Sequence, residues 1–285
     1  MTRAVTIGYA SMDYPAVLDG YFNGEATTLI KHRPADSFPR PGGCPLYAAG
    51  PLAAHGIPVS VITWVGDDEL GALYRASAVE QGIDPTGIGV VADGATPICF
   101  LIYQADGSCG CCFDPGFLGR ETLTEAQAAL IGQADLVAFT VGPPDIGMQA
   151  LDLVSGTARV AWVAKNDPRS YPDTLCAALG ARADYIFCNV HERAGVDRAL
   201  AAAGASRTPL IVETDGAAPV KVDRAGKVER IAVSELTFHD AVGAGDTLAG
   251  GCLAAIAAGQ TEPDRIAAAG IDAAGRLLEG RAIDD

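Results

Sequence analysis

The chain lacks the features of two common groups of proteins. Its 285 residues carry 20 Lys and Arg against 35 Asp and Glu, a formal net charge of −15. General binding of nucleic acid or of an anionic membrane surface needs a basic footprint, so neither is expected as a partner. No apolar run approaches the roughly eighteen residues of a membrane span. The three residues before the first apolar run carry no signal-peptide core. We therefore expect a cytoplasmic protein with reduced thiols.

Familiar cofactor and metal motifs are also missing. No G-x-x-x-x-G-K-[ST] stretch occurs, and no G-x-G-x-x-G follows the first apolar run, so neither a P-loop nor a standard dinucleotide site is expected. The four histidines have neither metal nor triad spacing. The cysteines of CGCC (109–112) are not a C-x-x-C pair, and no second pair follows at zinc-site distance, which favours ordinary strand or loop thiols.

What the chain does have is an alternation of apolar runs and helix-like segments. Near-continuous apolar runs are typical of strands buried on both faces of a parallel sheet. They cover residues 4–10, 59–66, 134–142, 159–165, 183–189 and 209–214. The helix-like segments cover residues 68–82, 124–132, 145–156, 171–181 and 191–204. This order predicts βαβ units in one α/β domain over residues 1–285, with a doubly wound, mostly parallel sheet flanked by helices.

Two segments interrupt the alternation. Residues 13–40 are rich in turns and contain a possible strand at 26–30, and residues 96–113 read as a hairpin whose turn is Ala-Asp-Gly at 105–107. Together they predict a small β-sheet that stands off the main one, as a lid or a dimerisation surface. Exposed apolar residues there, such as Phe100 and Ile102, lead us to expect a homodimer through the lid.

Polar residues follow most of the predicted strands. In an open α/β sheet ligands bind outside the carboxyl ends of the strands, although Asp and Asn are also ordinary caps and turn residues there. The candidates are Asp13, Asp67, Asp68, Lys165, Asn166, Asp167, Asn189, Glu192, Glu213, Thr214, Asp215 and Gly216.

The strongest candidate stretch is DAVGAGDTLAGG, residues 240–251. A glycine turn that enters a helix presents unpaired amides and the positive end of the helix dipole, which suit an anion. The carboxylate of Asp246 at this point would repel a bound phosphate, so a plain capping role explains it poorly. It is explained if Asp246 accepts a proton from an attacking hydroxyl during phosphoryl transfer. Asp240 is expected to orient the turn.

The chain resembles the ribokinase-like, or PfkB-type, carbohydrate kinase family, with motifs in family order over nearly the whole length. Residues 240–251 are similar to the C-terminal signature D-[ST]-x-G-A-G-D, and Asn189 to Glu192 match an N-x-x-E element. GGCPLYAAGPLAAHG (42–56) and WVGDDELG (64–71) resemble the N-terminal signature. Residues 96–108 resemble the β-lid of the family.

The resemblance implies a role for each matching residue. Asp246 would be the catalytic base, and the backbone of Val242, Gly243, Ala244 and Gly245 would form an anion hole over the γ-phosphate. Asn189 and Glu192 would help to hold magnesium and phosphate, with Glu192 reaching the metal directly or through water. The substrate would contact Asp13, Gly42, Gly43 and the residue at position 47. The nucleotide would contact the loop at Thr214, Asp215 and Gly216.

Three departures from the family pattern affect mainly the substrate. Tyr47 stands where the N-terminal signature usually carries Asn, and Ala241 stands where the C-terminal signature carries a hydroxyl residue. KNDPRSY (165–171) is only loosely similar to the D-x-N-x-R stretch of some members. None of these changes removes Asp246, Asn189 or Glu192.

The resemblance therefore implies an ATP- and Mg²⁺-dependent kinase that phosphorylates a hydroxymethyl group of a small sugar. Three alternatives stay open: a nucleoside kinase on the same fold, a non-catalytic member that binds a sugar or nucleotide, and a related glycosidase. The identity of the acceptor is not predicted, because Tyr47 replaces a familiar sugar contact.

Overall fold

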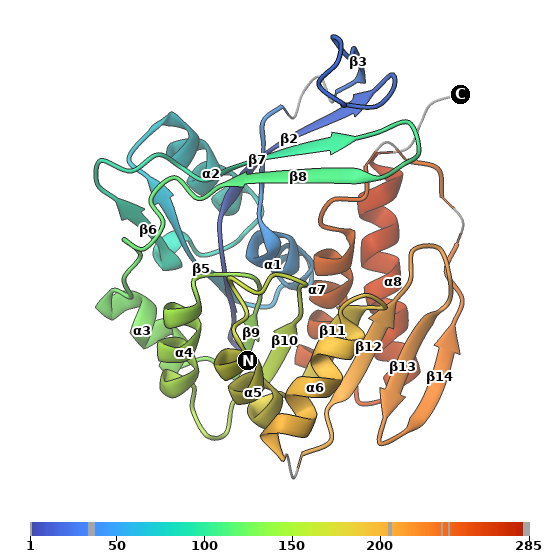
Figure 1. Cartoon of the computed structure of the whole chain (residues 1–285). Coiled ribbons are helices and arrows are strands. Elements are labelled where there is room, and N and C mark those ends of the chain that lie inside the picture. Colours follow the sequence, from blue (N-terminus) through green and yellow to red (C-terminus); the bar gives the residue numbers. More distant parts are fainter. Residues whose placement is uncertain (1, 34–37, 205–206, 235, 239, 282–285) are drawn as a thin grey trace.

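A large, mostly parallel sheet forms the body of the molecule. The computed structural model describes residues 2–33, 38–204, 207–234, 236–238 and 240–281, and the strand order of this sheet is β14-β13-β12-β11-β10-β9-β1-β5-β6 (Figure 1). The parallel strands are β1 (Ala4–Ile7), β5 (Val59–Gly66), β6 (Ile88–Val91), β9 (Leu136–Phe139), β10 (Arg159–Val163), β11 (Tyr185–Asn189) and β12 (Leu210–Thr214). The strands β13 (Val220–Arg224) and β14 (Lys227–Ile231) extend the sheet in antiparallel sense. The predicted sheet is confirmed.

Helices cover both faces of this sheet. One hydrophobic core joins it to α1 (Cys44–Ala54), α2 (Glu69–Glu80), α7 (Ala244–Ala257) and α8 (Pro263–Glu279). A second core joins the opposite face to α3 (Glu125–Gly132), α4 (Pro144–Leu153), α5 (Asp173–Arg182) and α6 (Arg193–Ala203). Because both faces are buried, the strands show continuous apolar runs rather than alternation. Among the described residues no helix combines the length and apolar character that a membrane span requires.

Glycines let α7 approach its neighbours closely. A Cβ on Gly250 would overlap the carbonyl oxygen of Ala48 in α1, and a Cβ on Gly251 would lie 2.6 Å from the carbonyl oxygen of Ala269 in α8. Backbone-to-backbone packing of this kind leaves α7 little freedom to shift or rotate. The N-terminus of α7 is thus held in a defined position relative to α1.

A second, smaller sheet crosses one end of the main sheet (Figure 1). It consists of β2 (Ser11–Leu18), β3 (Ile30–His32), β7 (Ile98–Tyr103) and β8 (Cys109–Asp114) in the order β3-β2-β7-β8, with β4 (Arg40–Gly42) paired to β2. β2 begins four residues after the last residue of β1. The small sheet therefore starts at the carboxyl edge of the main sheet.

The structure corrects several local predictions. The strand expected at 26–30 is wrong except for Ile30, the first residue of β3, and residues 34–37 of that segment lie outside the described part of the chain. Asp13 does not follow a strand but lies inside β2, whose Asp and Pro make a poor local strand pattern. The hairpin of β13 and β14 and the helix α8 were not predicted. The hairpin was missed because charged residues alternate along it.

Candidate active site

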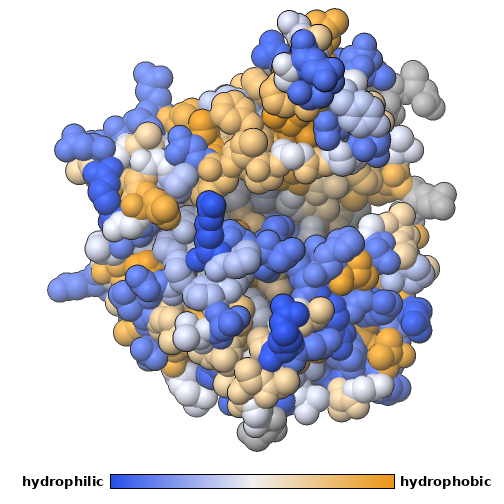
Figure 2. All heavy atoms as spheres, in the orientation of Figure 1, coloured by the Kyte–Doolittle hydropathy of each residue, from blue (hydrophilic) through white to orange (hydrophobic). Residues whose placement is uncertain are grey.

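The strand ends, the small sheet and two helix N-termini surround one site. The carboxyl ends of the parallel strands meet below the small sheet, and α1 and α7 both begin there (Figure 1). Figure 2 shows the surface hollowed between the small sheet and the body of the molecule. This is the edge at which open α/β sheets bind ligands.

The N-terminus of α7 is an open nest of amides. Gly243 precedes the helix in the left-handed region, with φ 76° and ψ −1°, which a glycine adopts without strain. The amides of Gly245 and Asp246 reach no backbone acceptor among the described residues. Asp246 lies in the first turn of α7 and is 6% exposed. A buried carboxylate thus adjoins unpaired donors at the positive end of a helix.

Asp240 holds the turn that precedes this nest. Its Oδ1 accepts hydrogen bonds from the amide of Val242 at 3.2 Å, from Nη2 of Arg40 at 2.7 Å and from Nη1 of Arg281 at 2.9 Å. Arg281 also donates to the carbonyl oxygen of Val242. Two buried guanidinium groups therefore clamp one buried carboxylate under the turn. Neither arginine stands out in the sequence, because both lie far from Asp240 along the chain.

A second carboxylate, Asp13, lies on the small-sheet side of the site. It is 3% exposed and accepts hydrogen bonds from Oγ of Ser11 at 2.8 Å and from the hydroxyl of Tyr47 at 2.9 Å. Burial raises the pKa of this carboxyl, while these two hydrogen bonds and the charge of Arg40 oppose the shift. A Cβ on Gly42 would overlap the Asp13 carboxylate, so only glycine leaves room for it there.

Tyr47 connects Asp13 to the turn at Gly243. Its ring packs flat on the turn, so that a Cβ on Gly243 would lie 2.5 Å from the ring, and its hydroxyl donates to Asp13. The guanidinium of Arg281 stands 5.9 Å from the ring centroid. Gly43 caps α1 at φ 87°, and a Cβ there would overlap the carbonyl oxygen of Tyr9. Tyr47 is therefore a built part of the site and fills space that a smaller Asn would leave open.

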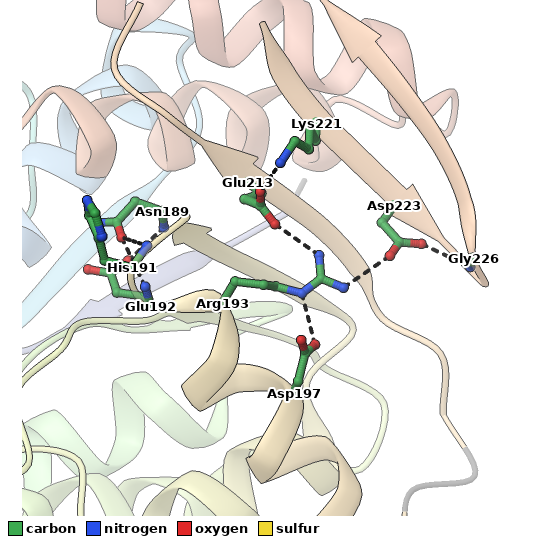
Figure 3. Close-up of polar contacts among 9 residues, drawn as sticks. All are labelled: Asn189, His191, Glu192, Arg193, Asp197, Glu213, Lys221, Asp223 and Gly226. Atoms are coloured by element: carbon green, nitrogen blue, oxygen red, sulfur yellow. Dashed lines mark hydrogen bonds and ion pairs between the residues drawn. The ribbon is translucent and has the colours of Figure 1, made fainter. Parts of the chain in front are cut away.

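Asn189 and Glu192 form a closed turn at the end of β11 (Figure 3). The Asn189 amide donates to Oε2 of Glu192 at 2.8 Å, and Oδ1 of Asn189 accepts from the amides of His191 at 2.9 Å and Glu192 at 3.0 Å. Burial raises the pKa of Glu192, and the attraction of Lys165 opposes this shift. Backbone amides hold the Glu192 carboxylate, and the charges of Lys165 and Asp246 act on it.

Thr214, Asp215 and Gly216 follow β12 next to this turn. Thr214 stands opposite Asn189 in the β11–β12 register, and its carbonyl oxygen accepts from the amide of Val190 at 3.0 Å. Gly216 turns the chain at φ 53°. The loop therefore borders the site directly.

A network of ion pairs connects α6 to β12 and β13 next to the Asn189 turn (Figure 3). Arg193 of α6 donates to Glu213 at 3.2 Å, to Asp223 at 3.2 Å and to Asp197 at 2.9 Å, and Lys221 pairs with Glu213 at 2.6 Å. Glu213 was a candidate for ligand contact, but the structure uses it to tie α6 to β12 and β13.

Other strand-end residues also serve the scaffold. Asp68 caps α2 through the amide of Gly71 at 2.8 Å and holds Thr96. Asp167 accepts from Oγ of Ser170 at 3.0 Å. In contrast, Lys165 and Cys44 belong to the site. The charge of Asp246 raises the pKa of Lys165, and burial together with Asp246 raises the pKa of Cys44.

Besides Arg40 of β4, which binds Asp240, Tyr103 of the small sheet also contacts the turn before the nest. The amide of Ala241 donates to the hydroxyl of Tyr103 in β7 at 3.1 Å. Ala241 lacks the side-chain hydroxyl of the family signature, and its backbone amide makes this contact to Tyr103. The three cysteines of the CGCC stretch lie in β8 of the same sheet. No group of three or more His, Cys, Asp or Glu in the described chain is arranged to hold a metal.

Solved structures show that this arrangement is a ribokinase-like fold. The structure of a putative ribokinase II from E. coli in complex with ATP and Mg²⁺ superposes with a TM-score of 0.80 at 16% identity, covering 99% of this chain and 94% of that one. At this identity the likeness concerns the fold. The pfkB family carbohydrate kinase model matches residues 1–275, so the chain belongs to that family.

Two curated relatives match this chain over only part of their length. An ATP-dependent ribose-1-phosphate kinase from Halopiger xanaduensis is 27% identical over 206 residues, which are 69% of this chain and 64% of that protein. A nucleoside kinase from Methanothermobacter thermautotrophicus is 24% identical over 189 residues, 66% of this chain and 60% of that protein. The matched part is thus less than two thirds of either relative.

Proposed function

We propose that this protein is an ATP-dependent kinase that transfers the γ-phosphoryl group to a hydroxymethyl group of a small sugar. The observation that carries the proposal is the buried carboxyl group of Asp246 beside the open amides of the α7 N-terminus. Family membership and the kinase names of the relatives support it.

In the proposed reaction Asp246 takes the proton of the acceptor hydroxyl. The acceptor oxygen forms a bond to the γ-phosphorus as the bond between that phosphorus and the bridging oxygen of ADP breaks, and ADP leaves with that electron pair. The amides around Gly243 and Gly245 donate to the phosphoryl oxygens as charge develops on them. Asp240, with Arg40 and Arg281, holds the turn in position. Closing the small sheet over the site would exclude water, which otherwise competes for ATP.

The acceptor is proposed to bind between Asp13 and the N-terminus of α1. The Asp13 carboxylate can accept hydrogen bonds from sugar hydroxyls, and Gly42 and Gly43 let the acceptor approach the backbone. Because Tyr47 fills space beside Asp13 where the family signature usually carries Asn, the acceptor is not named by analogy with other family members. A nucleoside acceptor remains the second candidate, since one relative is named a nucleoside kinase.

The test is to incubate the protein with ATP, Mg²⁺ and a panel of sugars and nucleosides and to follow ADP release. A kinase releases ADP only with its acceptor. A non-catalytic family member binds ligands in calorimetry without ADP release, and a glycosidase releases a base or sugar phosphate without using ATP.

Asp13→Asn is expected to raise the KM for the acceptor by about 10- to 100-fold, because a hydrogen bond to a charged group contributes about 1.5–3 kcal/mol. The same change should keep or raise the melting temperature. The pKa of Asp13 is raised on folding, so the stability linked to its protonation is present at low pH and is lost as the pH rises through the folded pKa. At neutral pH the ionised group thus costs stability, which a neutral Asn avoids.

The measurements are acceptor kinetics and thermal unfolding at pH 7. Asp19→Asn, an exposed aspartate just after the end of β2, is the matched control. A variant that melts lower and binds acceptor normally would show that Asp13 is a structural residue.

Magnesium is proposed to bind with ATP beside Glu192. Mg²⁺ usually keeps several waters and uses one or two carboxylates together with substrate phosphates. Glu192 fits this pattern, because backbone amides fix its carboxylate at the rim of the site and no all-protein cage surrounds it among the described residues. When bound, the ion would neutralise phosphate charge.

Glu192→Gln is expected to shift the magnesium dependence of turnover to roughly tenfold higher concentration, since it removes one negative charge from the metal side of the site. A magnesium titration at saturating ATP measures this shift. Glu125→Gln, an exposed glutamate in the first turn of α3, is the control. An unchanged titration curve would assign Glu192 to the turn alone.

The nucleotide is proposed to lie along Thr214, Asp215 and Gly216, beside the Asn189 turn.

The small sheet is proposed to act as a lid on a single domain and to pair with a second copy. Of the two residues expected to be exposed there, Phe100 is 46% exposed but Ile102 is partly buried. Phe113 is 39% exposed on the same sheet, so an apolar surface is available for a homodimer. Sedimentation at micromolar concentration measures the oligomeric state.

A further inference from the structure

Lys165 occupies the centre of the carboxyl edge of the main sheet. Val163 of β10 pairs in register with Phe187 of β11, and the amide of Ala164 donates to the carbonyl oxygen of Phe187 at 2.8 Å. Lys165 lies two residues beyond Val163, just as Asn189 lies two residues beyond Phe187. The two residues therefore stand side by side where the sheet meets the site.

Acidic side chains act on the charge of Lys165, yet no close ion pair holds its ammonium among the described residues. Asp246 has the largest influence on it, followed by Cys44 of the α1 N-terminus, Glu192 and Cys111 of β8. Within the described chain the ammonium forms no hydrogen bond or close ion pair, and the side chain is exposed. By contrast, Lys221 and Lys227 are paired with Glu213 and Glu229 at 2.6 and 2.8 Å. The raised pKa keeps Lys165 protonated through the neutral range.

The charges of Asp246 and Glu192 stabilise the Lys165 ammonium, which stays available to an anion that enters the site. A phosphoryl group at the α7 nest would stand near Asp246 and Glu192, both of which repel it. The amides of the nest are partial charges and cannot cancel two carboxylates. An ammonium on the same side of the site supplies the missing positive charge.

We propose that Lys165 contacts the oxygens of the phosphoryl group in transit between ATP and the acceptor and neutralises part of its charge. This inference rests on the kinase function proposed above. Lys165 keeps its proton throughout, since the proton of the acceptor hydroxyl goes to Asp246. The residue is thus a catalytic cation, contributed by the KNDPRSY stretch at the point where that stretch departs from D-x-N-x-R.

The test compares Lys165→Gln and Lys165→Arg with the unchanged protein. The Gln variant should lose about 10²–10³-fold in kcat, the effect of removing one donor to a developing oxyanion, with ADP affinity within about twofold in calorimetry. The Arg variant should recover part of kcat, because it restores the charge with a different shape. Lys227→Gln, an exposed lysine far from the site, is the control for general loss of charge.

A second measurement needs no turnover. ADP, Mg²⁺ and aluminium fluoride together mimic the planar phosphoryl group, and the Gln variant should bind this combination about tenfold or more weakly than the unchanged protein while binding ADP alone equally well. A role confined to charge balance around Asp246 predicts equal binding of the mimic. Thermal unfolding of both variants checks that the fold persists.

The outcomes separate the two proposals. If the unchanged protein turns over an acceptor and the Gln variant keeps kcat within threefold, the role of Lys165 is overturned and the kinase function stands. If the unchanged protein phosphorylates none of the acceptors, the kinase function fails, and the aluminium fluoride measurement still decides whether Lys165 binds a phosphoryl group.

Discussion

Asp246→Asn is expected to lower kcat by about 10²–10⁴-fold, the range that a positioned general base contributes. The amide keeps the shape of the carboxylate but cannot accept the proton of the acceptor hydroxyl. Because the open amides around Gly243 and Gly245 belong to the backbone, they remain in place, and the affinity for ADP should change little. The expected loss therefore appears in kcat and not in nucleotide binding.

Steady-state kinetics and calorimetry with ADP measure these two quantities. Asp145→Asn is the matched control, since Asp145 is also an aspartate in the first turn of a helix but is exposed on α4. Turnover that survives Asp246→Asn would remove the base from the mechanism. A parallel loss of ADP binding would instead indicate that the first turn of α7 had moved.

Asp240→Asn is expected to reduce the free energy of unfolding by about 3–5 kcal/mol, the usual cost of removing one partner from a buried ion pair. The side chain of Asp240 is 4% exposed, and those of Arg40 and Arg281 are 10% and 11% exposed. Removal of the negative charge leaves two buried guanidinium groups with only neutral acceptors. The turn at Val242 would also lose the fixed acceptor of its amide, so kcat should fall with stability.

Denaturant unfolding measures the first effect. Asp197→Asn serves as the control, because its pair with Arg193 is a helix i,i+4 pair whose aspartate is 55% exposed, and such pairs contribute about 0.2–1 kcal/mol. If Asp240→Asn unfolds within about 1 kcal/mol of the unchanged chain, the two arginines find other partners and the clamp is not a stabilising unit.

Much of the fold could be predicted because both faces of the main sheet are buried. Residues 59–66 were predicted as a strand and form β5 with the same bounds, and the helix expected at 124–132 begins one residue later as α3. The second helix shows the limit of this reasoning. The helical spacing of Leu70, Leu73 and Ser77 predicts that they share its buried face, but Leu73 is 44% exposed. The buried residues of α2 are Gly71, Tyr74 and Ala78. The face of α2 that packs on the core is set by the fully buried Tyr74, with Gly71 and Ala78 beside it.

The candidate site also contains one part that the sequence predicts and one part that it does not. The turn around Gly243 and Asp246 could be recognised from local chemistry, because a glycine turn, a carboxylate and a helix start are contiguous in the chain. The charges around that turn could not. Arg40 and Arg281 reach Asp240 from 200 and 41 residues away, and Lys165 was visible only as one of many polar residues at strand ends.

The amino-acid sequence by itself determined the alternating α/β pattern, the helix that opens at Gly243 and the position of Asp246 in its first turn. These features depend on hydrophobic periodicity and on the backbone freedom of glycine, which act over a few residues. Only the tertiary structure decided that Tyr47 links Asp13 to the Gly243 turn, that two arginines clamp Asp240, and that the charge of Asp246 acts on Lys165. Those contacts depend on how strands and helices distant in the chain pack together, and no local pattern records that packing.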